Sequence, residues 1–72
     1  MDGAVLGPSE RVPALTPLQR EVLRLVANGR TNAEIAEWLG MTPGTVGTQV
    51  GRILERLGLE CRADIAPWVA GW

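Results

Sequence analysis

Residues 31–57 read TNAEIAEWLGMTPGTVGTQVGRILERL, and this stretch predicts two helices joined by a very short turn. Thr31 and Glu34 have the spacing of a capping box, which predicts a helix start directly after Thr31. A glycine ends this helix, and Thr42 then precedes Pro43, a residue favoured at the first position of the next helix. Apolar residues recur along this second helix at helical spacing. Two helices this close in sequence are typical of a helix-turn-helix.

The flanking residues extend the pattern to an all-α, compact four-helix domain over residues 15–72. Thr16, Pro17 and Gln19 mark the start of a preceding helix. A short fourth helix is predicted after the turn at residue 58, and Pro67 is expected to kink or end it. Residues 1–14 contain two glycines and two prolines without periodicity, which indicates a flexible leader or linker. The predicted helices span residues 17–28, 32–39, 43–57 and 62–66, with no strand.

Composition limits the classes of protein to consider. Seventy-two residues form one domain with a modest core, which a dimer would help to stabilise. The net charge is −1 and all seven cations are arginines, whereas DNA-binding proteins usually carry a basic excess. A single cysteine, Cys61, excludes an internal disulfide and favours a reducing, cytoplasmic compartment. Neither a membrane-spanning apolar run nor a signal peptide is visible.

The sequence lacks the residues that catalytic chemistry needs. It has no histidine, no second cysteine and no paired-carboxylate motif, so we expect no metal, no cofactor and no enzymatic activity. Glu34 is explained as a helix cap, and Arg20 and Glu21 as polar contacts that anchor a helix. Cys61 is expected to have a structural role at the start of the fourth helix.

Three strings, LTPLQREVLRLVANGRTNAEIAEWLGMTPGTV, RILERLGL and RAD, resemble the LuxR-type (GerE-like) helix-turn-helix DNA-binding domain of bacterial transcription regulators. The resemblance covers about fifty residues, from Leu15 to Asp64. It implies that the third helix, residues 43–57, enters the major groove of double-stranded DNA in a sequence-specific manner. It also implies a homodimer, with the fourth helix as the expected contact.

The third helix departs from the family's usual pattern, Thr-Val-Lys-Thr-His-Val. Here Gly47 replaces the lysine, Gln49 replaces the histidine, and Gly51 stands where a polar or basic residue is frequent. A glycine has no side chain with which to read a base edge. The family often touches bases at positions 47, 48 and 51, so weak intrinsic affinity is expected.

The resemblance assigns one polar face of this helix to DNA. Arg52 is expected to contact phosphate or guanine, Gln49 to contact adenine, and the threonines to contact phosphate. On a DNA-binding face we also expect Arg30 to cluster with Arg52 and Arg56. The complete predicted set is Thr45, Gly47, Thr48, Gln49, Gly51, Arg52 and Arg56.

Two alternatives keep the same fold but change the partner. In the first, the domain is a protein-interaction module with weak or no DNA binding, which predicts a contiguous apolar surface. Trp38 lies one position off the buried stripe, as either a core-edge residue or an exposed contact, and the C-terminal tryptophans either fold back or contact a partner. The candidate partner or dimer contacts are Trp38, Ile65, Trp68 and Trp72. The second alternative is a sigma-region-4-like element that works only with polymerase.

Overall fold

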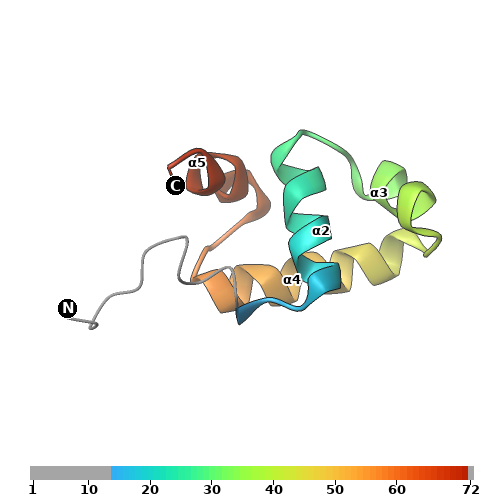
Figure 1. Ribbon diagram of the computed structural model, residues 1–72, viewed down its shortest axis with the longest axis horizontal. Coiled ribbons are helices and arrows are strands. Elements are labelled where there is room, and N and C mark those ends of the chain that lie inside the picture. Colours follow the sequence, from blue (N-terminus) through green and yellow to red (C-terminus); the bar gives the residue numbers. More distant parts are fainter. Residues whose placement is uncertain (1–13, 72) are drawn as a thin grey trace.

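The computed structural model describes residues 14–71, which form four α-helices and one short 3-10 helix without any strand. The predicted leader, apart from Ala14, and Trp72 lie outside these residues. In Figure 1, α4 runs along one side of the domain, α2 crosses it near its middle, and α3 and α5 lie towards opposite ends. The predicted all-α fold with a helix-turn-helix is confirmed. The elements are α2 (Pro17–Ala27), α3 (Asn32–Leu39), α4 (Pro43–Leu57), η2 (Arg62–Asp64) and α5 (Ile65–Ala70).

Local capping interactions start the first three helices where the sequence predicts them. At α2, the Gln19 amide donates to Thr16 Oγ1 at 3.1 Å, and the Thr16 amide donates to Gln19 Oε1 at 3.1 Å. The same reciprocal box opens α3 between Thr31 and Glu34, at 3.1 and 2.9 Å. Each box satisfies two helix-terminal donors and contributes about 1 kcal/mol. The starts of these helices are therefore encoded within a few residues.

Left-handed glycines end the two helices of the helix-turn-helix. Gly40 and Gly58 both adopt φ 71°, which suits glycine because it has no Cβ to clash with the backbone. After Gly40, the Met41 amide donates to the Ala36 carbonyl at 2.9 Å and closes the turn tightly. This turn sets the direction in which α4 leaves α3.

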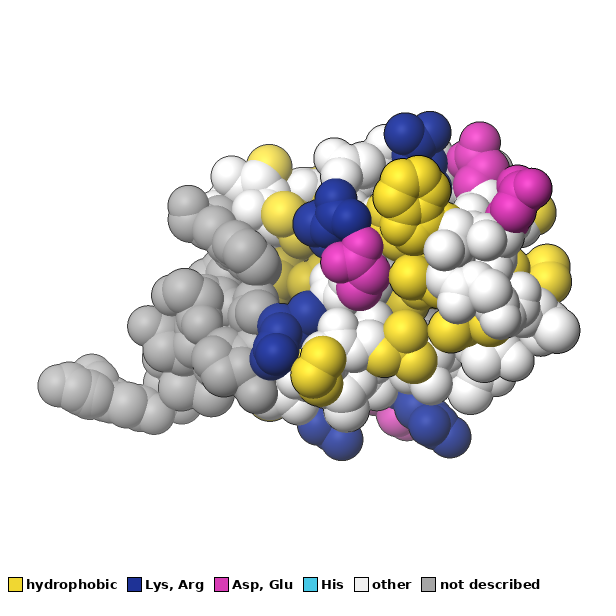
Figure 2. Space-filling view, turned by 45° about the vertical axis from the view of Figure 1, so that its right-hand side comes forward, with side chains coloured by type: hydrophobic (Ala, Val, Ile, Leu, Met, Phe, Trp, Pro, Cys, Tyr) yellow, Lys and Arg dark blue, Asp and Glu magenta, His cyan; other side chains and the backbone are white. Residues whose placement is uncertain are grey.

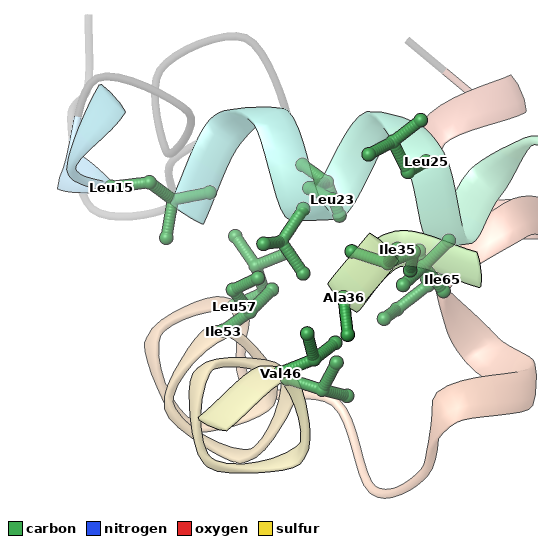
Figure 3. Close-up of a cluster of buried hydrophobic side chains, with 12 residues drawn as sticks. Leu15, Leu23, Leu25, Ile35, Ala36, Val46, Ile53, Leu57 and Ile65 are labelled. Atoms are coloured by element: carbon green, nitrogen blue, oxygen red, sulfur yellow. The ribbon is translucent and has the colours of Figure 1, made fainter. Parts of the chain in front are cut away.

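A wholly aliphatic core joins the helices (Figure 3). The apolar stripes of α2, α3 and α4 face one another, and α5 adds one fully buried residue to them. Burial of each such side chain contributes about 1.5–3 kcal/mol, so these contacts are the main source of tertiary stability. The core residues are Leu15, Val22, Leu23, Leu25, Val26, Ile35, Ala36, Val46, Val50, Ile53, Leu57 and Ile65.

The C-terminal region differs from the prediction. The expected helix at residues 62–66 is instead a 3-10 turn followed by α5, which continues through Pro67 to Ala70. Pro67 is the third residue of α5, where a backbone N–H would lack an intrahelical partner, so proline is tolerated. The prediction that Pro67 ends the helix is therefore wrong. At α2 the difference is small, because Asn28 is the C-cap and the helix ends at Ala27.

Packing of α5 also corrects one predicted contact. Ile65 is 0% exposed and belongs to the core, so its side chain is not available to a partner, and its assignment as a dimer contact is wrong. Trp68 is half-buried and packs against the same core, which supports the fold-back interpretation of this tryptophan. Within residues 14–71, no helix is long and apolar enough to cross a membrane.

Candidate nucleic-acid interface

The second helix of the helix-turn-helix presents one continuous exposed face. α3 and α4 form the most extensive helix pairing in the domain, and Val46, Val50 and Ile53 hold α4 against the core. The opposite side of α4 is open to solvent over its whole length. The exposed residues of α4 are Pro43, Gly44, Thr45, Thr48, Gly51, Arg52, Glu55 and Arg56.

The two exposed threonines are already hydrogen-bonded within the helix-turn-helix. Thr45 Oγ1 lies 3.0 Å from Thr42 Oγ1, and Thr42 also caps the Thr45 amide at 3.2 Å. Thr48 Oγ1 donates to the Gly44 carbonyl at 3.2 Å, a bond that Ser and Thr commonly make within helices. Because the Thr48 hydrogen is directed at the backbone, donation to a phosphate requires this hydroxyl to rotate.

The two glycines leave part of the face without side chains. A Cβ placed at Gly51 would meet no atom within 4 Å, and one at Gly47 would meet only Asn32 Nδ2, at 3.7 Å. Both positions have room for a Cβ, so packing within the domain does not require glycine at either of them. The glycines instead bring the α4 backbone close to whatever approaches this face.

The arginines of the predicted set have different surroundings. Arg52 and Arg56 are exposed one turn apart on α4, with Glu55 between them in sequence. Arg56 Nη1 donates to the Ala14 carbonyl at 2.6 Å, which ties the segment before α2 to α4. Arg30 instead lines a hollow between α2 and α3. The α4 face therefore carries two cations and one anion.

Gln49 packs against α2. Its Oε1 accepts a hydrogen bond from Gln19 Nε2 at 3.3 Å, and Gln19 is only 4% exposed. Bidentate reading of adenine requires both the oxygen and the nitrogen of the amide. The structure therefore shows that Gln49 connects α4 to α2, and the predicted adenine contact stays a prediction. This role of Gln19 is not evident from the sequence, because the capping box alone explains a glutamine there.

Trp38 is 73% exposed, so its interpretation as a core-edge residue is wrong. It borders a hollow of about 320 Å³ between α2 and α3. Figure 2 shows hydrophobic surface on one face of the domain, with basic and acidic side chains around it. The hollow is lined by Leu25, Arg30, Glu34, Ile35, Glu37 and Trp38.

Arg20 makes a structural contact of the kind that the sequence predicts, whereas Glu21 pairs only within its own helix. Arg20 Nη1 donates to the Leu15 carbonyl at 3.1 Å. Glu21 forms an exposed ion pair with Arg24, whose hydrogen bond lowers the pKa of the Glu21 carboxyl.

Cys61 is exposed and free, and its amide donates to Asp64 Oδ2 at 3.4 Å. Within residues 14–71, no three acidic or cysteine side chains are grouped to bind a metal.

Comparison with known proteins agrees with this architecture. The family described as bacterial regulatory proteins, luxR family, matches residues 13–69. The chain is 40% identical over 58 residues to the nitrate/nitrite response regulator protein NarL of Escherichia coli, covering 81% of this chain and 27% of NarL. It is 41% identical over 51 residues to the transcriptional regulatory protein MctR of Rhizobium johnstonii, covering 71% of this chain and 24% of MctR.

A third relative is the transcriptional regulatory protein DesR of Bacillus subtilis, 42% identical over 50 residues that cover 69% of this chain and 25% of DesR. The chain thus spans about a quarter of the length of these three relatives. No solved structure gave a significant match. The family match over most of the chain and the helix-turn-helix geometry lead to one conclusion: this chain belongs to the luxR family of bacterial regulatory proteins.

Proposed function

We propose that this domain binds double-stranded DNA through the exposed face of α4 and thereby serves bacterial transcription regulation. The observation that carries the proposal is the open α4 face of a helix-turn-helix, held by its opposite side against the core. In this motif the second helix lies in the major groove, and its N-terminal residues reach base edges. Such a role would place the domain in the cytoplasm. The proposed DNA-facing residues are Thr45, Gly47, Thr48, Gly51, Arg52 and Arg56.

The charge of the domain sets the expected strength of this binding. From Leu15 onward the chain has six arginines and six acidic residues, and it has no lysine. Each phosphate neutralised by a cation contributes about −0.9 to the slope of log K against log salt. With Arg52 and Arg56 as the cations on the face, we expect a shallow slope of about −2 and weak non-specific affinity.

A salt titration against random-sequence duplex DNA tests the proposal. Fluorescence anisotropy with a labelled duplex should show binding at low salt that weakens with the shallow slope given above. Circular dichroism at each salt concentration verifies that the domain remains folded. If the folded chain does not bind duplex at the lowest salt, the protein-interaction alternative becomes the better one.

We also propose a homodimer through the exposed side of α5. Ile65 is internal, so the outer surface of this helix consists of Ala66, Pro67 and Ala70, whose small apolar side chains allow close approach of a second copy. Sedimentation equilibrium should show a concentration-dependent dimer that Ala66→Glu dissociates. A monomer at all concentrations, with and without DNA, would remove this proposal and leave DNA binding to single domains.

Trp38 supports a second proposed contact, with a protein partner, made alongside DNA binding. Tryptophan is enriched at protein interfaces, and this one is mostly exposed beside a hollow. Because Trp38 borders the hollow between α2 and α3 and lies outside the exposed face of α4, Trp38→Ser should leave the affinity for duplex DNA unchanged. A large loss of DNA affinity in a folded Trp38→Ser variant would instead assign Trp38 to the DNA interface.

A further inference from the structure

The side chain of Asn32 is held from one side and open on the other. Asn32 is the first residue of α3 and is partly buried. Its Oδ1 accepts a hydrogen bond from Arg62 Nη1, and Arg62 Nη2 donates to the Arg30 carbonyl at 2.6 Å. Arg62 is therefore fixed at two points, and this fixes the direction of the Asn32 oxygen. The Asn32 nitrogen must then point away from Arg62.

The nitrogen of Asn32 lies beside Gly47. A Cβ at Gly47 would be 3.7 Å from Asn32 Nδ2, so this amide group lies where α3 meets the face of α4. No described residue accepts a hydrogen bond from Nδ2, which has two N–H donors. A long side chain at position 47 would compete for the same space. This nitrogen is not among the buried polar atoms that lack a partner, and glycine at 47 places no side chain against it.

We infer that Asn32 Nδ2 donates a hydrogen bond to a backbone phosphate of bound DNA, with Arg62 as the residue that positions it. This inference rests on the proposed DNA-binding function and adds a contact outside α4. A phosphate is the acceptor because the first helix of a helix-turn-helix crosses the DNA backbone, whereas the second enters the groove. Amide side chains commonly make such backbone contacts. A neutral donor also suits a surface that carries few cations.

Two asparagine variants test the contact. Asn32→Ala should weaken binding to the random-sequence duplex by about 10- to 100-fold, as expected for loss of one hydrogen bond to a charged acceptor. The salt slope should stay unchanged because no charge is lost. Asn28→Ala is the matched control, because Asn28 is the chain's other asparagine and caps the far end of α2. Thermal unfolding verifies that both variants are folded. Equal affinity of Asn32→Ala and the parent, or equal losses in both variants, overturns the inference.

A phosphate-by-phosphate scan separates a direct contact from a structural effect. Methylphosphonate groups, which are uncharged, replace single phosphates in a duplex selected for binding by the parent chain. At one phosphate the loss seen with the parent should be absent in Asn32→Ala, while the losses at other phosphates persist. Losses that add at every phosphate would contradict a direct contact. A changed preference for one base pair without this coupling would mean a base contact and would overturn the phosphate assignment.

Arg62 provides the test of positioning. Arg62→Met should weaken binding, leave the salt slope unchanged, and add little to the loss caused by Asn32→Ala. Additive losses, or a slope shallower by about 1, would show that Arg62 acts independently or contacts DNA itself. If the parent chain fails to bind any duplex, the proposed function fails before this inference is tested. If the parent binds and Asn32→Ala binds equally, only this inference fails.

Discussion

Arg52 and Arg56 lie one turn apart on α4, but they differ in their hydrogen bonds within the protein. Arg56 is held by the Ala14 carbonyl, whereas Arg52 has no hydrogen bond or ion pair among residues 14–71. An unengaged guanidinium can form bidentate contacts with phosphate or guanine without first breaking a contact within the protein. Arg52 is therefore the residue of this face whose removal should affect DNA most and folding least.

Arg52→Ala should weaken DNA binding by roughly 1–3 kcal/mol and leave the unfolding midpoint unchanged. Anisotropy titrations measure the affinity, and thermal unfolding measures the stability. Arg24→Ala is the matched control, because it removes the same charge from an exposed position on α2. If the two variants lose the same affinity, net charge explains the effect and Arg52 makes no specific contact.

Gly47→Lys should change stability and affinity together. The new Cβ has room, and replacing a glycine inside a helix stabilises it by somewhat under 1 kcal/mol. The lysine adds a charged phosphate contact, so affinity should rise at low salt and the salt slope should steepen by about 1. In the Gly47→Lys background, Asn32→Ala should then cause a smaller loss of DNA affinity, because the side chains at positions 32 and 47 occupy the same part of the surface.

Gly47→Ala separates the helix effect from the charge effect, because it stabilises the helix without adding a cation. A Gly47→Lys variant that is more stable but gains no DNA affinity at low salt would count against the leading function. This result would favour the alternative in which the exposed face of α4 binds a protein partner, with the glycines allowing that partner to approach the backbone closely.

At the level of the helices, local signals determine which features the sequence predicts. The starts of α2, α3 and α4 depend on caps within three residues, so they follow from the sequence. The extent of α5 does not follow from the sequence, because the effect of Pro67 depends on where the preceding 3-10 helix η2 ends. The burial of Ile65 and the contact between Gln49 and Gln19 are not evident from the sequence, because the groups involved come together only in the tertiary fold. The exposed face of α4 is predictable, but the surroundings of its side chains are not.

The docking of α5 onto the core gives a prediction for this element. Ile65→Ala should destabilise the domain by about 2–5 kcal/mol, because Ile65 is fully buried and truncation leaves a cavity. In a domain this small, that loss is a large part of the total stability. Chemical denaturation measures it, and Val69→Ala, at a partly buried position of the same helix, should cost less. Equal losses in the two variants would mean that α5 contributes little to the core through Ile65.

For the molecule as a whole, the proposed surfaces lie on different elements. The DNA face belongs to α4, the proposed dimer surface to α5, and the Trp38 hollow to α3 and the end of α2. Because α3 and α5 lie towards opposite ends of α4 in Figure 1, a partner at Trp38 and a second copy at α5 need not compete. A single small domain can therefore present three separate contacts.

The titration behaviour of the whole domain follows from its composition. The chain has no histidine, so stability should be nearly constant between about pH 6 and 8. The Arg24 hydrogen bond lowers the pKa of Glu21 from 4.5, so its contribution is present above that value and is lost as the pH falls through the lower folded pKa. The contribution is small because the pair is exposed. Thermal unfolding from pH 3 to 8 measures it, with Glu21→Gln as the control, and a midpoint that shifts between pH 6 and 8 would contradict this account.

The open space at Gly47 and Gly51 also makes the domain a scaffold for reprogramming. Neither position is in the core, and an added Cβ would meet at most the Asn32 side chain, so small side chains should be tolerated by the fold. A combinatorial library at these two codons would vary the reading surface while leaving every helix cap and core residue in place. Selection of such a library against chosen operator sequences would show whether this one backbone can be made to bind many different DNA sequences.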